Sequence, residues 1–265
     1  MYTNGSYSID DVVRYAPNKQ YSNSLNYLVS KSEDYSNQLE NTQQIVPEYK
    51  GNHQKTIIYP TNNYSFNENK PTKTYYFTPK IFLNPVRPKT RFINTTTQIQ
   101  SLIEETFELM LNKKLPNNIS IQVCNKEELK QLHSRFGSWN DNIQGFALNN
   151  KNMKQIFVRN NDLDELMLTI GHEIGHVYTK KLDNSHDEEA KAFSFAMQWA
   201  KTIRKHDIGN LKENIKDDLD FNPARNGLHD LAFFFVKNLM AKGIKPMQVH
   251  WDLVSGYVSL WNFYL

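Results

Sequence analysis

The chain has 265 residues and a formal net charge of +3, from 31 basic and 28 acidic side chains. A weak charge spread over this length gives little attraction to nucleic acid, so we expect no nucleic-acid partner. The longest unbroken apolar run, Leu231 to Val236, has six residues, whereas a membrane-spanning helix needs about 20, so we expect no membrane partner. The single cysteine, Cys124, excludes an intrachain disulfide framework and a cysteine-based zinc finger. We therefore expect a cytoplasmic protein in which any transition metal is held by His and carboxylate side chains.

The first 80 residues differ in composition from the rest of the chain. They hold 11 of the 14 tyrosines and five of the ten prolines, and Asn and Ser are frequent. From Val46 to Pro88 no hydrophobic period is sustained, which is typical of a linker. We predict that residues 1–90 form a weakly ordered extension, with a partner-binding or autoinhibitory arm as the alternative, and that residues 91–265 form the folded domain.

The sequence after residue 90 has the periodicity of a folded domain. Apolar residues at helical spacing predict four helices, over residues 97–111, 126–136, 162–181 and 185–205. Alternating β-branched residues predict three strands, over residues 118–123, 144–148 and 155–158, with the last two joined by a polar turn. The part from residue 226 on is aromatic-rich and predicted to be helical. This order predicts an α+β domain, with a small mixed sheet and an edge strand followed by a helical part.

The helix over residues 162–181 carries the motif Gly-His-Glu-Ile-Gly-His, residues 171–176. His172 and His176 are four residues apart and therefore share one helix face, where both imidazoles can reach one zinc ion. Glu173 is placed to accept a proton from a zinc-activated water. The apolar stripe of this helix lies away from the histidines, so we expect one face to pack on a core and the other to line a cleft. Gly171 and Gly175 predict a close neighbour beside the helix.

A catalytic zinc ion needs a third protein ligand and an open position. Glu189, thirteen residues after His176, lies on a small apolar helix face, where a carboxylate without a cation would be costly to bury. Ser185 followed by Glu188 predicts a capping box, which gives Glu188 the role of a capping carboxylate. We therefore predict Glu189 as the third ligand, with His186 as the alternative.

The segment from Gly145 to Met197 resembles the ImmA/IrrE-type zinc peptidases, within the wider gluzincin group. The matching strings are GFALN at 145–149, IFVRN at 156–160, LTIGHEIGHVY at 168–178 and DEEAKAFSFAM at 187–197. The resemblance implies a zincin-like fold, one zinc ion held by His172, His176 and Glu189, and Glu173 as the general base. Gluzincins related to thermolysin carry an Asp one turn after the third ligand to orient a zinc histidine. Phe193 stands there in this chain, so that partner is missing or comes from elsewhere.

In zincins an edge strand lines the cleft and pairs with an extended substrate, and residues 145–149 fit that strand. On the resemblance, backbone groups near Ala147, with Phe146 and Leu148 beside it, would hold the peptide. The sequence leaves several candidates for the donor that stabilises the oxyanion. His229 is the first candidate, and the others are His250, Tyr178, Tyr257 and Arg225.

Taken together, these features predict a zinc-dependent endopeptidase that acts on a protein or peptide substrate. The alternative is a catalytically inactive zinc-binding protein with a regulatory or interaction role on the same fold. A further alternative places the activity in the N-terminal extension, as a partner-binding or nucleic-acid-binding regulator.

Overall fold

A computed structural model of the chain describes residues 77–150, 153–217 and 228–260. Most of the predicted extension, the centre of the hairpin turn and Arg225 lie outside these residues. The described part is α+β, as the sequence predicts, and it holds two small sheets and six α-helices. Of its helices, none has the length and apolar character that a membrane span requires.

The main sheet has three strands in the order β2-β4-β3. Strand β2 (Ile119–Cys124) runs parallel to β4 (Lys154–Arg159), and β3 (Gly145–Asn149) pairs with β4 in the antiparallel sense. Ala147 lies opposite Ile156, so the predicted hairpin is confirmed. Two-residue strands β1 (Phe92–Ile93) and β5 (Asn161–Asp162) form a separate antiparallel ladder.

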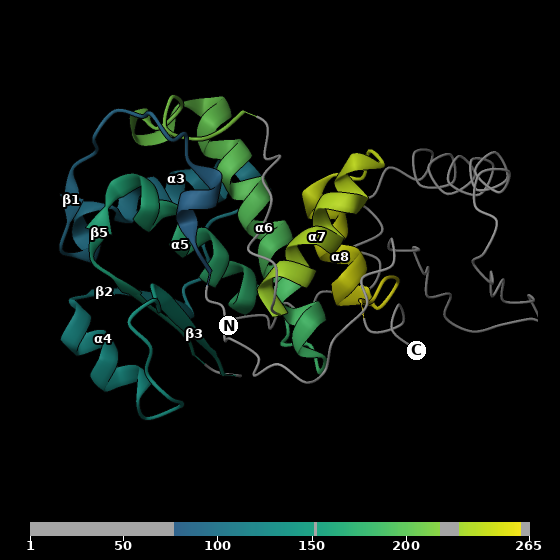
Figure 1. Cartoon of the computed structure of the whole chain (residues 1–265), viewed down its shortest axis with the longest axis horizontal. Helices are drawn as coiled ribbons and strands as arrows, with labels where there is room; N and C mark the ends of the chain where they lie inside the picture. Colours follow the sequence, from purple (N-terminus) through teal and green to yellow (C-terminus); the bar gives the residue numbers. More distant parts are fainter. Residues whose placement is uncertain (1–76, 151–152, 218–227, 261–265) are drawn as a thin grey trace, which may run out of the picture. The chain divides into compact units, whose positions relative to one another are not determined.

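Helices cover both faces of the main sheet (Figure 1). On one face lies α4 (Lys126–His133), where Leu129 packs in a small core with Phe157 of β4. On the other face lies α5 (Leu163–Val177), which contacts β3 and β4. Because side chains alternate along a strand, residues next to Phe157 point towards α5. The motif helix therefore lies against the sheet, next to its edge strand.

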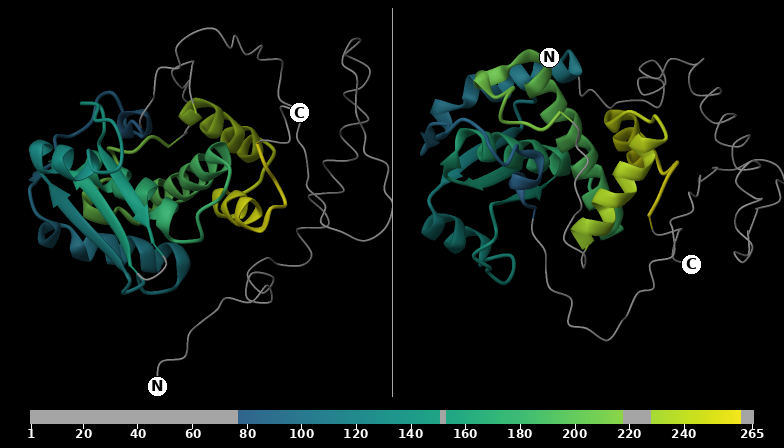
Figure 2. Two further views of the ribbon diagram at one scale, coloured as in Figure 1. Left: turned by 90° about the horizontal axis from the view of Figure 1, so that it is seen from below. Right: turned by 45° about the horizontal axis from the view of Figure 1, so that its top comes forward.

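The helical half is built around α6 (Ser185–His206), which packs directly on α5. Helices α7 (Leu228–Ala241) and α8 (Pro246–Ser255) lie on the side of α6 away from the sheet (Figures 1 and 2). Helix α3 (Gln100–Leu111) also contacts α6. The predicted helices are present, but α5 ends at Val177, four residues earlier than predicted.

The two glycines of the motif allow α5 and α6 to pack closely, as predicted. A Cβ on Gly171 would lie 2.4 Å from Cδ1 of Trp199, and a Cβ on Gly175 would lie 2.8 Å from the Cα of Ala192. The contact of α5 with α6 covers the histidine face as well, and His172 is only 1% exposed. The side chain of His176 on the same face is 17% exposed, and the expectation that this face lines a cleft stays a prediction.

Residues 77–90, which the sequence assigns to the extension, pack on this same domain. The 3-10 turn η1 (Pro79–Phe82) contacts α5, and the side chains of Phe82 and Leu83 are buried. The backbone N–H of Lys216 donates to the carbonyl of Phe82 at 2.9 Å. This hydrogen bond ties the segment to the chain that follows α6.

Candidate metal centre

Two adjacent helices bring the three predicted ligands together. His172 and His176 lie on α5, and Glu189 lies in the first turns of α6; one ligand atom from each residue lies within 4.8 Å of the other two. The Nε2 atom of His172 is 3.5 Å from Oε2 of Glu189, and Nε2 of His176 is 3.7 Å from Oε1. Both imidazoles thus turn the same nitrogen towards one carboxylate. In the described part of the chain His186, the alternative third ligand, is not a member of this group.

The pKa shifts of His172 and Glu189 favour the forms that bind a metal ion. Burial lowers the pKa of His172 to about 4, which leaves its imidazole neutral at pH 7. Burial alone would raise the pKa of Glu189, but the electrostatic influence of the imidazoles of His229 and His176 outweighs it, so the pKa lies well below its usual range. A neutral imidazole and an ionised carboxylate are the forms that bind metals. Oε2 of Glu189 is buried and has no hydrogen bond within the described residues, so a cation there would satisfy it. The group could therefore hold a metal ion.

Helix α6 begins at Ser185 as predicted, but the predicted capping box is wrong, since neither Ser185 nor Glu188 caps the helix. The N-cap is Asn184, not Ser185, and its side-chain oxygen accepts the N–H groups of His186 and Asp187. With Asn184 as the N-cap, the third helical position, from which a capping-box carboxylate reaches back, is Asp187 and not Glu188. Glu188 points towards α5 instead and is 8% exposed.

Glu188 instead supplies the partner that the sequence leaves open for a histidine of the candidate metal site. Its Oε1 atom accepts from Nδ1 of His176 at 2.9 Å. Its Oε2 atom accepts from the backbone N–H of Leu182 at 2.7 Å and pairs with Nζ of Lys191 at 2.9 Å. A proton held on Nδ1 leaves Nε2 of His176 free as a ligand. Phe193, at the expected Asp position, packs edge-on against His172.

Lys191 ties the end of the motif helix to α6. Its side chain is fully buried, and its Nζ donates to the carbonyls of His176 at 3.2 Å and Lys180 at 2.8 Å. Asn149 of β3 donates to the same carbonyl of His176 at 2.8 Å. Side chains from the sheet and from α6 thus take the last carbonyls of α5, which fits its end at Val177.

Glu173, the predicted general base, follows His172 on α5 and is 5% exposed. Burial is the main cause that raises its pKa to about 7, and the nearby Glu189 adds to this, whereas His176 and His229 oppose it. A carboxyl group of this pKa can exchange protons near neutral pH.

His229 reaches the metal centre from α7. Its Nδ1 atom lies 2.9 Å from Oε2 of Glu189, although within the described residues neither atom has a hydrogen bond of good geometry. Of the other oxyanion candidates, His250 is buried and its Nδ1 donates to the carbonyl of Lys191, while Tyr178 packs against Trp251 and Tyr257 is 43% exposed. Arg225 lies outside the described residues.

Strand β3 forms one edge of the main sheet in the described part of the chain. The N–H of Arg159 donates to the carbonyl of Gln144, which fixes the phase of the ladder with β4. Because hydrogen-bonded pairs alternate along an antiparallel ladder, Phe146 and Leu148 direct their backbone groups at β4, and Ala147 directs its own at the open edge. The side chains of Phe146 and Leu148 pack on the α4 side.

No protein-family model, curated protein or solved structure matches this chain.

Proposed function

We propose that the chain is a zinc-dependent endopeptidase of the gluzincin type, with a zincin-like fold similar to that of the ImmA/IrrE peptidases. The observation that carries this proposal is the meeting of three ligands from two helices. Two histidines of a His-Glu-x-x-His motif turn their Nε2 atoms towards Glu189, and Glu173 lies beside them on the same helix. Two imidazoles and one carboxylate are a donor set typical of catalytic zinc.

The chain's own residues supply the remaining chemistry. A bound zinc ion would act as a Lewis acid towards the substrate carbonyl and water. The Glu173 carboxylate accepts a proton from the attacking water and delivers it to the leaving amine nitrogen. His229, whose Nδ1 atom lies 2.9 Å from Oε2 of Glu189, is assigned to the developing negative charge on the substrate.

The open edge of the main sheet is an argument for a peptide substrate. The backbone N–H and C=O of Ala147 face the open edge of β3, where an extended peptide can add as a strand. Main-chain pairing of this kind binds many sequences, which suits an endopeptidase.

Metal content and cleavage tested together decide this proposal. We expect the purified wild type to hold one zinc ion per chain and to cleave a denatured-protein substrate, and a chelator to abolish the cleavage. Glu189→Ala should lose zinc and cleavage, whereas the matched control His186→Ala should keep both. Zinc that survives in Glu189→Ala and disappears in His186→Ala would move the third ligand to His186.

A second candidate function is a zinc-binding protein without catalysis, and one observation favours it. The contact between His229 and Glu189 at 2.9 Å places a third imidazole at the site, where it could close the position that a substrate needs. If His229 holds the metal, His229→Ala should weaken zinc binding, and the wild type should cleave nothing. If the chain is the peptidase, His229→Ala should keep its zinc and lose turnover.

A further inference from the structure

The two metal-binding histidines are held in different ways. Glu188 fixes His176 through a hydrogen bond at Nδ1. The Nδ1 atom of His172 is buried and has no hydrogen bond within the described residues. Aromatic rings enclose the His172 imidazole instead. Phe77 stacks on it at 4.1 Å between ring centroids with a 12° interplanar angle, and Phe193 meets it at 5.0 Å and 63°.

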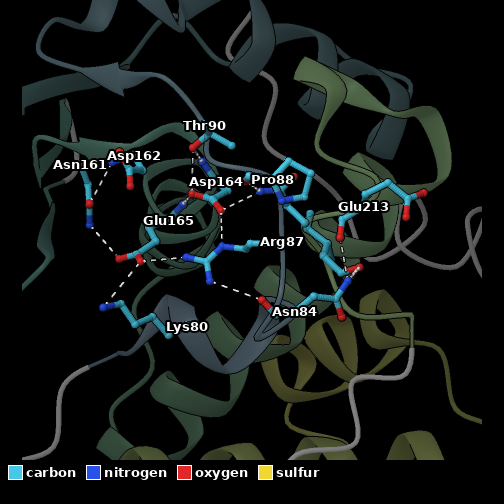
Figure 3. Close-up of polar contacts among 12 residues, drawn as sticks. Lys80, Asn84, Arg87, Pro88, Thr90, Asn161, Asp162, Asp164, Glu165 and Glu213 are labelled. Atoms are coloured by element: carbon cyan, nitrogen blue, oxygen red, sulfur yellow. Dashed lines mark hydrogen bonds and ion pairs between the residues drawn. The ribbon is translucent and has the colours of Figure 1, made fainter.

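Phe77 belongs to a segment, residues 77–91, that is anchored at the N-terminal end of α5. Arg87 donates to Oδ2 of Asp164 at 2.6 Å and to Oε1 of Glu165 at 3.2 Å, both in the first turn of that helix (Figure 3). Thr90 donates to Oδ1 of Asp164 at 3.1 Å. We call residues 77–91 the strap, because it contacts α5 at its first turn and again at His172.

The strap is also tied to the chain after α6. The N–H of Asn84 donates to the carbonyl of Asn214 at 2.8 Å, and Leu83 forms an isolated antiparallel bridge with Ile215. The side chain of Asn214 in turn donates to the carbonyl of Pro88 at 2.8 Å. These contacts come from backbone and side-chain groups that are distant in the sequence, so they hold the strap in one position.

We propose that Phe77 is a positioning residue of the metal centre, and that the strap holds its ring against His172 so that Nε2 of that imidazole stays directed at Glu189. The proposal rests on the proposed metal site and extends it to a segment outside the motif. Phe77 is 6% exposed, so its ring both restrains the imidazole and keeps water from it. Without a hydrogen bond at Nδ1, the ring orientation of His172 depends on the stacked ring of Phe77 and the edge contact with Phe193.

The proposal makes a specific prediction for metal binding. Groups that orient a metal ligand typically change metal affinity by about 10–100-fold when they are removed. We expect Phe77→Ala to weaken zinc binding by a factor in that range. We expect it also to change the visible spectrum of bound cobalt(II), because the imidazole can then tilt. Phe77→Tyr, which keeps the ring, should bind zinc as the wild type does.

The test uses the full chain with zinc chloride or cobalt chloride alone as the probe, and needs no substrate. Phe157→Ala is the matched control, since Phe157 is 8% exposed and stacks on Phe146 at 5.1 Å on the α4 side of the sheet. It should lose stability and keep the zinc affinity. A cooperative urea-unfolding transition shows that each variant is folded. Phe77→Leu, which keeps an apolar side chain in place, serves if Phe77→Ala does not fold.

The possible results distinguish failure of the positioning role of Phe77 from failure of the proposed function. If the wild type binds zinc and a folded Phe77→Ala or Phe77→Leu variant binds it equally with the same cobalt spectrum, the positioning role is overturned and the metal site stands. An equal loss in Phe157→Ala would also overturn it. If the wild type binds no zinc, both proposals fail, because Phe77 then has no centre to position.

Discussion

Replacing Glu188 by Gln tests how the site holds His176. The Glu188 side chain is 11% exposed and accepts from three donors: Nδ1 of His176, the N–H of Leu182 and Nζ of Lys191. Gln has one acceptor oxygen and one NH₂ donor in the same space. If the oxygen faces His176, the NH₂ group meets the two other donors. If the amide is turned round, NH₂ meets Nδ1, and the imidazole must carry its proton on Nε2, the nitrogen that faces Glu189.

The expected loss of stability follows from the hydrogen-bonding groups that Gln leaves without a partner. A hydrogen bond to a charged group contributes about 1.5–3 kcal/mol, and a buried charge that loses its partner costs about 3–5 kcal/mol. Lys191 keeps two carbonyl partners, so we expect Glu188→Gln to lower the free energy of unfolding by about 3 kcal/mol. Zinc affinity should fall by about 10–100-fold, since the orienting partner of His176 is lost.

Two measurements separate stability from metal binding. Urea unfolding in excess chelator gives the stability without the contribution of bound metal. Competition with a chromophoric chelator gives the zinc affinity. The matched control is Glu127→Gln, an exposed carboxylate in the first turn of α4. The double variant with Lys191→Met should be less destabilised than the sum of the single variants, because the two groups lose the same ion pair.

The result that would refute this reasoning is a Glu188→Gln protein that matches Glu127→Gln in both stability and zinc affinity. A loss of stability with an unchanged zinc affinity would limit Glu188 to joining α5 and α6.

Three further perturbations test other parts of the account. Gly175→Ala should lower the free energy of unfolding by about 1–3 kcal/mol in urea and weaken zinc binding, because the methyl group would lie 2.8 Å from the α6 backbone. Gly137→Ala, with its nearest atom at 3.6 Å, should be neutral, and equal effects of the two would contradict the packing argument. Deleting residues 1–76 should leave a folded protein that still binds zinc. Deleting residues 1–90 removes residues 77–90 of the strap and breaks the ion pair of Arg87 with Asp164, which should lower the free energy of unfolding by about 3–5 kcal/mol; equal stability of the two truncations would contradict this. Burial lowers the pKa of His250 to about 3, so the unfolded state alone takes up a proton as pH falls below 6.5, and stability is lost between about pH 6.5 and 3. The loss from this group at pH 4.5 should be about 3 kcal/mol, and His250→Gln should flatten the urea-unfolding midpoints measured against pH; an unchanged slope would contradict it.

The parts of the site that could be predicted from sequence are those that local spacing decides. Four-residue spacing on one helix places His172 and His176 together, and the glycines beside them indicate a close neighbouring helix. Glu189 could be predicted because a carboxylate on a small apolar face calls for a cation. The helices and the β3–β4 hairpin were predictable for the same reason, since their periodicity is local.

The parts that could not be predicted depend on contacts between distant segments. Glu188 has the spacing of a capping residue, and only the position of α5 shows that it faces His176. The strap has no hydrophobic period, because isolated residues such as Phe77 and Arg87 anchor it. Their partners on α5 lie at least 77 residues away in the sequence.

The central claim is that Glu173 carries out proton transfer at a zinc site, and the most direct test compares the wild type with Glu173→Gln. Both proteins are loaded with zinc, their metal content is measured, and both are incubated with the same denatured-protein substrate. We expect one zinc ion per chain in both, and cleavage by the wild type only. Equal cleavage by the two zinc-loaded proteins would contradict the role of Glu173, and cleavage by neither would contradict the peptidase assignment.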